Sequence, residues 1–467
     1  MLVIISDLHL TDGSSGETIR DIAFRAFADR LRGLAYDASW RKDGRYQPLE
    51  ELHLVLLGDI LDVIRSTKWL EDQAGVSVRP WSDSASQLFI NKVSAITSDI
   101  LKRNQASFAT LKSLTRDGVI TIPEATSEGK PALVGWEPTS PHRQTVKVRI
   151  HYLVGNHDWF FHLPHAPYNA IRLSVAEALG LETPADRPFP HDPYESDVLP
   201  QVYRDHHVFA RHGDIYDSYN FAGNRDASSL GDAVVVELID RFAMTVREEM
   251  ANQLPPALLA GLNEIDNLRP TFIIPVWIDG LLRKTCPNEP GLQKKVKDVW
   301  DSMVDDLIKL DFVQQHHSFF HLFDKVEDLE WGLKFSKGVS HGNLSRLYAW
   351  ISEKFGTKEK SYYPNALSEV NFKNRTARFI VYGHTHWHET VPLASILTDE
   401  GILNQIYINS GTWRPYHELA QPHPEQEEFV GYEVMTYLSF FKDDERGGRL
   451  FESWSGVLGQ RPLSEKN

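Results

Sequence analysis

Three histidines lie within five residues of the segment VYGHTHWHE, residues 381–389, directly after an apolar run. Neutral imidazole is the commonest side-chain ligand for transition-metal ions, so this group suggests a metal site. A solvated turn would also explain the histidines, because Gly383 interrupts the apolar pattern. The segment alone leaves both interpretations open, and the other polar clusters of the chain must decide between them.

Similar polar clusters follow four other apolar runs. They read SDLH, GDILD, GNHD and RHGD, and they cover residues 6–9, 58–62, 155–158 and 211–214. Each cluster stands at the C-terminal end of a run that is typical of a β-strand. In open α/β sheets, ligands bind outside the carboxyl ends of the strands. If these strands lie side by side in one direction, all five clusters converge on one site.

The combined donor set fits two divalent cations that lie close together. Carboxylate, amide and imidazole donors suit Mn, Fe or Zn, and one carboxylate has to bridge the two ions. In an extended segment, residues two apart face the same side, which pairs Asp7 with His9 and His384 with His386. Two ions roughly 3.5–4 Å apart can hold both oxygens of an in-line displacement at phosphorus. The sequence therefore predicts phosphoester chemistry at a dinuclear centre.

Seven apolar runs predict the strands that position these clusters. They cover residues 2–6, 52–59, 148–156, 207–214, 378–384, 405–411 and 431–441. Apolar residues at helical spacing predict helices over residues 17–38, 86–114 and 170–180. Alternating strands and helices are typical of an α/β fold.

The chain has 467 residues, which is too long for one ordinary hydrophobic core. We expect a core formed by residues 1–214 and 376–467, with an irregular excursion at 162–205 that is rich in Pro, Asp and His. Residues 215–375 are expected to form a mainly helical insertion. Its predicted helices cover residues 231–250, 293–310 and 343–356. The many aromatic residues of this insertion either fill its own core or face a substrate beneath a cap.

Composition limits the class of partner. The formal net charge is −15, which argues against a non-specific nucleic-acid binder, since such proteins neutralise phosphates with a basic surface. No apolar run approaches the length that spans a bilayer, and the N-terminus lacks the features of a secretory signal. The single cysteine, Cys286, fits a reducing compartment. These features predict a cytoplasmic protein without an integral membrane segment, and they leave the oligomeric state unknown.

The order D-x-H, G-D-x-x-D, G-N-H-D, H-G-D and G-H-x-H resembles the calcineurin-like metallophosphoesterase superfamily. This resemblance implies a four-layer α/β/β/α sandwich of two mixed sheets, with a dimetal site at the strand ends and a large inserted cap in this chain. The segments SDLHL, residues 6–10, and RHGDIYD, residues 211–217, resemble the bacterial branch of UDP-diacylglucosamine pyrophosphohydrolases. Members of that branch are shorter, tend to carry Arg at the position of His157, and have a smaller cap.

The resemblance also implies a role for each motif residue. The expected ligands of the first ion are Asp7, His9 and His386. The expected ligands of the second ion are Asn156, His212 and His384. Asp59 is expected to bridge both ions. His157 is expected to protonate the leaving alkoxide or to stabilise the charged transition state. Asp62 is the expected hydrogen-bond partner of His157, and Asp158 is the alternative.

Two residues after a later strand are candidate substrate contacts. Trp413 would stack on a substrate and Arg414 would contact a phosphate, and a packed turn is the alternative for both residues. The expected activity is hydrolysis of a small-molecule phosphodiester, phosphomonoester or pyrophosphate by a metal-bridged hydroxide. The alternatives are a metal-dependent nuclease, which the acidic charge disfavours, and a non-catalytic binding module, which the complete set of ligands disfavours.

Overall fold

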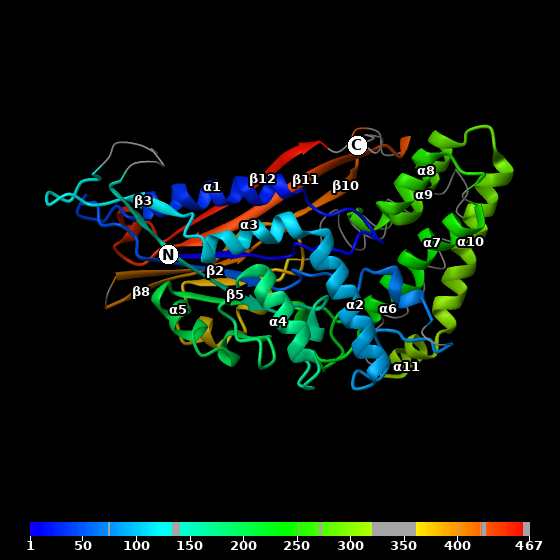
Figure 1. Ribbon diagram of the computed structural model, residues 1–467, viewed down its shortest axis with the longest axis horizontal. Coiled ribbons are helices and arrows are strands. Elements are labelled where there is room, and N and C mark those ends of the chain that lie inside the picture. Colours follow the sequence, from blue (N-terminus) through cyan, green and yellow to red (C-terminus); the bar gives the residue numbers. More distant parts are fainter. Residues whose placement is uncertain are drawn as a thin grey trace.

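The computed structural model describes residues 1–72, 75–132, 141–250, 252–269, 273–319, 361–399, 401–420, 422 and 426–460. Over these residues the chain is a mixed α/β protein with two large mixed sheets and many helices (Figure 1). The helix expected over residues 343–356 lies outside the described residues.

The first sheet has six strands in the order β10-β11-β1-β2-β5, with β12 paired to β11. Its parallel part consists of β1 (Leu2–Ile5), β2 (Glu51–Leu57) and β5 (Lys147–Leu153). Its antiparallel part consists of β10 (Arg414–Leu419), β11 (Phe429–Phe440) and β12 (Phe451–Gln460). All four residues of β1 are buried, as expected for a parallel strand that is covered on both faces.

The second sheet has four strands in the order β6-β7-β9-β8. Strands β6 (Val208–Arg211), β7 (Phe379–Tyr382) and β9 (Gly401–Asn409) are parallel, and β8 (Glu389–Thr398) is antiparallel to β9. A separate hairpin joins β3 (Thr121–Pro123) to β4 (Arg143–Thr145). Each of the seven strands that the sequence predicts is therefore present.

Several strands were not expected from the sequence, and β8 illustrates why. Its segment contains Pro392, which cannot donate a hydrogen bond and so argues against a strand. Strand β8 lies at the edge of its sheet, and the register shifts between Pro392 and Ala394. A proline is tolerated at such an edge because its nitrogen need not pair with a further strand.

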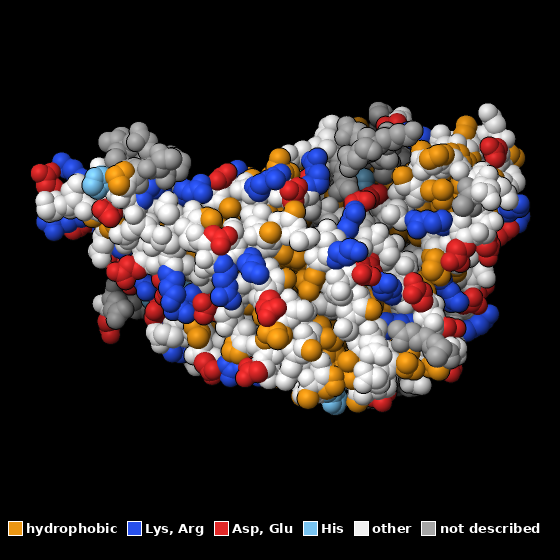
Figure 2. All heavy atoms as spheres, viewed as in Figure 1, with side chains coloured by type: hydrophobic (Ala, Val, Ile, Leu, Met, Phe, Trp, Pro, Cys, Tyr) orange, Lys and Arg blue, Asp and Glu red, His pale blue; other side chains and the backbone are white. Residues whose placement is uncertain are grey.

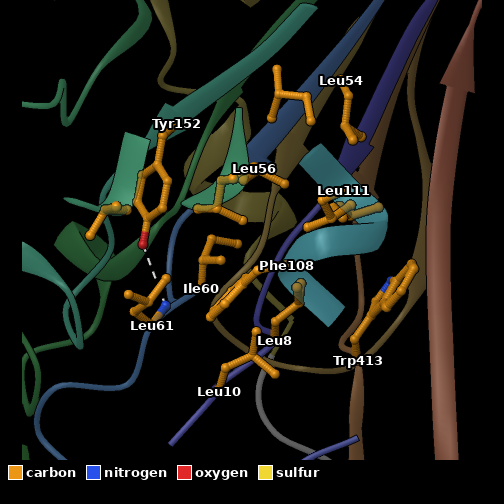
Figure 3. Close-up of a cluster of buried hydrophobic side chains, with 14 of the residues drawn as sticks. Leu8, Leu10, Leu54, Leu56, Ile60, Leu61, Phe108, Leu111, Tyr152 and Trp413 are labelled. Carbon is orange, nitrogen blue, oxygen red and sulfur yellow. Dashed lines mark hydrogen bonds between the residues drawn. The ribbon is translucent and has the colours of Figure 1, made fainter. Parts of the chain in front are cut away.

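Four helices pack against one face of the first sheet. They are α1 (Asp21–Ala38), α2 (Gln87–Arg103), α3 (Gln105–Arg116) and α4 (Tyr168–Leu179), and their apolar faces join one large core cluster with the strands (Figures 1 and 3). The segment predicted to be helical, residues 86–114, is helical in the structure, and the chain divides it into α2 and α3 at Asn104. The Asn104 side chain donates to the carbonyls of Ile100 and Thr11 and so holds the break in place.

The excursion at 162–205 contains α4 and a second short helix, α5 (Leu199–Asp205), which the sequence did not predict. It also contains two single turns of 3-10 helix, η2 (Trp159–His162), at its beginning, and η3 (Pro193–Glu195). After β6, the turn η4 (Asp214–Tyr216) leads towards the helical insertion.

The insertion has its own hydrophobic core. Its helices are α6 (Leu230–Val234), a π-helical segment (Val235–Asp240), α7 (Arg241–Met250), α8 (Pro256–Asn263), the turn η6 (Ile265–Asn267), α9 (Ile274–Thr285), α10 (Pro290–Lys309) and α11 (Asp311–Phe319). They gather at one end of the molecule in Figure 1. Trp277 and Trp300 are buried in this core, which agrees with the core-filling interpretation of these two aromatic residues. The short helices α14 (Tyr363–Ala366) and α15 (Val370–Lys373) return the chain to β7.

Two features of the surface bear on partners. Figure 2 shows Lys and Arg interspersed with Asp and Glu over this face, rather than gathered in one basic patch. Among the described residues, no helix is long and apolar enough to cross a membrane.

Candidate metal centre

The polar clusters of five strand ends meet at one place. Strands β1, β2 and β5 are neighbours and parallel in the first sheet, and β6 and β7 are neighbours and parallel in the second. The residues that follow these strands are in contact across the two sheets. For example, the backbone N–H of His384 donates to both carboxylate oxygens of Asp7, at 3.1 Å each. The convergence that the strand ends predict is therefore present.

One group of buried donors consists of Asp7, His9, Asp59 and His386. One ligand atom from each residue lies within 4.8 Å of the others. His9 Nε2 lies 2.9 Å from His386 Nε2 and 3.6 Å from Asp59 Oδ2. His386 Nε2 lies 3.3 Å from Asp7 Oδ1. Two imidazole nitrogens and two carboxylates thus face a common point, which is the arrangement a divalent ion requires.

A second group consists of Asp59, His212 and His384, with Asn156 beside it. His212 Nε2 lies 3.2 Å from Asp59 Oδ2 and 3.2 Å from Asn156 Oδ1. His384 Nδ1 lies 2.9 Å from the same amide oxygen of Asn156. Asp59 belongs to both groups, so its carboxylate lies between the two sets of donors.

The backbone is strained where these donors lie. Asp7, His9, Asp59, His384 and His386 all have positive φ angles, between 44° and 68°. Residues with a Cβ rarely adopt this region, and such strain tends to gather at functional sites. This explains why the donors of the D-x-H and G-H-x-H motifs curl around a point instead of continuing as extended strands.

Glycines allow the elements to approach closely at the centre. A Cβ placed on Gly155 would collide with the Asp59 carboxylate and with the His212 ring, which would lie 2.7 Å away. A Cβ on Gly383 would lie 2.7 Å from Asp7 Oδ2. The glycines of GNHD and GHTH are therefore required by space around the carboxylates.

In three of the imidazoles, the ring nitrogen that faces away from the donor groups lies next to a hydrogen-bond acceptor. Asp62 Oδ2 lies 2.6 Å from His9 Nδ1, the Leu57 carbonyl lies 2.9 Å from His212 Nδ1, and Asp217 Oδ2 lies 3.0 Å from His384 Nε2. An acceptor behind a ring keeps the proton on that nitrogen and directs the lone pair of the other nitrogen towards the ion. The sequence gave no sign that Asp62 also contacts His9.

His157 lies beside the donor groups and pairs with Asp62. Its Nδ1 is 2.7 Å from Asp62 Oδ1, so this one carboxylate holds both His9 and His157. Asp158, the alternative partner, instead accepts from the backbone N–H groups of Gly155 and Ile60 and from the Tyr152 hydroxyl. Asp158 therefore fixes the loop, and it does not orient His157.

The charges of the site suit cations. Asp7 and Asp59 are almost fully buried, and among the described residues neither forms an ion pair with Lys or Arg. Burial raises the pKa of Asp7 to about 6. Burial also acts to raise the pKa of Asp59, but His212 and His157 outweigh it and keep this pKa below its usual value. Buried carboxylates need compensating positive charge, which divalent ions would supply.

The imidazoles divide into two classes. Burial lowers the pKa of His9 to about 3 and also lowers that of His386, so both rings are neutral, as metal ligands must be. For His212, burial opposes the charged form, but Asp59 outweighs it and raises the pKa to about 10, so an ion that binds this ring would have to displace a proton. For His157, Asp62 and Asp59 likewise outweigh burial and raise the pKa to about 9. His157 is thereby prepared to carry a proton at neutral pH.

The two candidate substrate contacts lie elsewhere. Trp413 is fully buried in the large core cluster, donates from Nε1 to the Thr436 carbonyl, and packs edge-on against Phe27 at 4.9 Å. Figure 3 shows its ring among apolar side chains, near Leu111. No face of this indole is open to a substrate, so the packed-turn alternative replaces substrate stacking.

Arg414 is also buried, and its hydrogen bonds link the core to the insertion. Its Nη2 donates to the Asp266 carbonyl at 2.9 Å and to Asn267 Oδ1 at 2.8 Å. A different arginine faces the donor groups. Arg269 follows the turn η6 of the insertion, and its Nη2 lies 3.0 Å from His386 Nδ1. No motif in the sequence marked Arg269.

Comparison with known proteins adds no identification. The chain matches no protein-family model, and no curated protein matches it. What the structure itself provides is a pair of buried His and Asp groups that can hold metal ions.

Proposed function

We propose that this chain is a dinuclear metal-dependent phosphoesterase of the calcineurin-like superfamily. The observation that carries the proposal is the sharing of Asp59 by two buried donor groups, one with His9 and His386 and the other with His212 and His384. Divalent Mn, Fe or Zn fits such mixed carboxylate and imidazole donors. Two bound ions would supply a hydroxide at neutral pH and would polarise the phosphoryl oxygens.

The arrangement of the sheets supports the same family. One buried cluster contains side chains of both sheets, among them Leu2 and Val55 from the first and Val381 and Ile408 from the second. Two sheets that share a core in this way, with helices outside the first, fit a four-layer α/β/β/α sandwich. We propose that residues 1–214 and 376–467 form this sandwich and that residues 215–375 form its cap.

His157 acts as the proton donor in this proposal. Its Nδ1 is committed to Asp62, which leaves Nε2 as the nitrogen that can give a proton to the leaving oxygen. Asp62 and Asp59 keep the ring protonated, since they raise its pKa to about 9 against the effect of burial. A positioned acid of this kind typically contributes about 10²–10⁴-fold to the rate.

Arg269 is the best-supported contact for the substrate phosphate. A neutral imidazole that binds an ion through Nε2 carries its proton on Nδ1, so His386 Nδ1 would then no longer accept from Arg269. The guanidinium would lie at the rim of a site that takes an anionic group, and arginine matches phosphate oxygens in pairs. We propose that Arg269 takes the role that the sequence suggested for Arg414.

The substrate class in this proposal is a small-molecule phosphodiester, phosphomonoester or pyrophosphate. A nuclease remains the alternative activity, and it is disfavoured by the net charge of −15 and by the interspersed charges of Figure 2. A binding module on the same fold would not need His157, Asp62 and the whole donor set together.

The test is hydrolysis of bis-p-nitrophenyl phosphate and p-nitrophenyl phosphate by the Mn²⁺-loaded protein. Asp59→Asn should abolish turnover of the preferred substrate and reduce bound manganese, because Asp59 contributes to both donor groups. His388→Ala is a matched control from the same GHTHWH segment, because its Nδ1 lies 2.8 Å from the Asn409 carbonyl and it belongs to neither donor group. Full activity of Asp59→Asn would overturn the proposal.

A further inference from the structure

A third cluster of metal-binding side chains lies outside the centre described above. His162, His191 and Asp226 each offer one ligand atom, and these atoms lie within 4.8 Å of one another. His162 Nδ1 is 2.6 Å from Asp226 Oδ1, and His191 Nε2 is 3.0 Å from the same oxygen. We propose that these three residues form a separate mononuclear site for a transition-metal ion, with Zn²⁺ as the natural occupant.

The distances suit a tetrahedral ion with small adjustments. Zn²⁺ binds imidazole nitrogen at about 2.0–2.1 Å, which sets neighbouring ligand atoms of a tetrahedron roughly 3.3 Å apart. The observed separations of 2.6 and 3.0 Å would have to open by about 0.7 and 0.3 Å to reach this spacing. The two rings lie close together, with centroids 4.1 Å apart and planes inclined at 43°.

Glu195 completes the arrangement behind His162. Its Oε2 lies 3.4 Å from His162 Nε2 and also accepts from the backbone N–H of His191, at 2.9 Å. A carboxylate behind one imidazole nitrogen keeps the proton there and leaves the other nitrogen, Nδ1, as the ligand. The backbone contact ties Glu195 to His191, so the same side chain organises both imidazoles.

Burial supports a designed site rather than a chance surface group. The His191 residue is only 4% exposed, and its Nδ1 is a buried nitrogen that has no hydrogen-bond partner among the described residues. A buried imidazole needs at least one strong interaction to offset the loss of its hydration. A metal ion on Nε2 would provide that interaction. The Asp226 and His162 side chains, 32% and 24% exposed, leave the ion a path from solvent.

The site would join three segments that are distant in the sequence. His162 ends the turn η2, His191 lies later in the excursion, and Asp226 lies in the first part of the insertion, before α6. The neighbouring Arg225 donates from Nη2 to Asp214 Oδ1 at 2.8 Å, and Asp214 follows the H-G-D glycine of the proposed catalytic centre. The ion would therefore fix the loop that leads to the cap against the core.

An ion pair is the competing explanation. Asp226 and Glu195 outweigh burial and raise the pKa of His162 to about 9, so a protonated His162 would also satisfy both carboxylates. The two explanations differ in one measurable respect, because only the first requires a metal ion.

The test is the zinc content of the chain by native mass spectrometry after removal of metals and reconstitution with Zn²⁺. Asp226→Asn and His162→Ala should each bind one ion fewer than the wild type and should lose part of the thermal stabilisation by Zn²⁺. His165→Ala is the matched control, because this exposed histidine lies on the same segment outside the cluster. Both side chains are partly exposed, so at least one of the two variants should fold and report the zinc content.

The outcomes separate this proposal from the proposed function. Equal zinc content in the wild type, Asp226→Asn and His162→Ala would overturn the third site and favour the ion pair. If Asp59→Asn left the zinc content unchanged while Asp226→Asn lowered it, the dinuclear centre would fail and the third site would stand. Loss of ions in both variants would support both proposals.

Discussion

Asp62 is the residue whose replacement most sharply tests how the proposed site works. Its two carboxylate oxygens each accept from one imidazole, from His9 Nδ1 at 2.6 Å and from His157 Nδ1 at 2.7 Å. An asparagine has the same shape but only one acceptor oxygen, and its amide nitrogen can only donate. In Asp62→Asn, one of the two rings must therefore face the amide N–H with its Nδ1, which can then carry no proton; His9 would hold its proton on Nε2, and His157 would lose its positive charge.

Either choice damages the proposed mechanism. If His9 is the ring that changes, its Nε2 carries a proton and cannot bind an ion, and loss of such outer partners typically costs about 10–100-fold in metal affinity or activity. If His157 changes, the proton donor is lost, which costs about 10²–10⁴-fold in rate. We expect kcat/KM of Asp62→Asn to fall by about 10²–10⁴-fold, with more loss for an alkyl leaving group than for p-nitrophenolate.

The pH profile gives a second signature. In the wild type, the Asp62 charge is the leading influence that outweighs burial and raises the pKa of His157 to about 9. Removal of that charge lowers this pKa, so the alkaline limb of kcat/KM should move to lower pH. The assay is kcat/KM against pH for two diesters with good and poor leaving groups, with exposed Asp29→Asn as the control. An unchanged rate and an unchanged alkaline limb in Asp62→Asn would refute this role of Asp62.

Four further variants test the surroundings of the centre. Gly155→Ala should lower bound metal and destabilise the fold by about 1–3 kcal/mol, measured by urea unfolding, because its Cβ would collide with the Asp59 carboxylate. Asp217→Asn should weaken metal binding by about 10–100-fold in a competition titration, because it removes the acceptor behind His384; unchanged affinity would contradict this. Arg269→Ala should raise KM without changing the amount of bound metal, because this arginine is the proposed phosphate contact. Arg414→Ala should instead lower the free energy of unfolding, because Arg414 bonds Asn267 of the insertion.

The donor groups could be predicted from the sequence because their positions depend on local rules. Asp7, Asp59, Asn156, His212 and His384 follow parallel strands, and the carboxyl ends of such strands meet at one edge. The strands themselves were recognisable as short apolar runs. The order of the clusters along the chain resembles a known superfamily, and this resemblance predicted the role of each residue.

Residues that depend on tertiary packing could not be predicted in this way. Trp413 follows a strand as a substrate platform would, but its ring fills the core beneath α1 and α3. Arg269 reaches the centre only because the insertion folds back on the core. The edge strand β8 was not predicted because it contains Pro392. The cluster of His162, His191 and Asp226 was not predicted because its residues are far apart in the sequence and form no motif.

The central claim is that two ions share Asp59, and anomalous diffraction from crystals grown with Mn²⁺ tests it most directly. We predict two anomalous peaks, roughly 3.5–4 Å apart, one on each side of the Asp59 carboxylate. His9 and His386 should bound the first peak, and His212 and His384 the second. A single peak, or none at these residues in manganese-saturated crystals, would contradict the dinuclear centre.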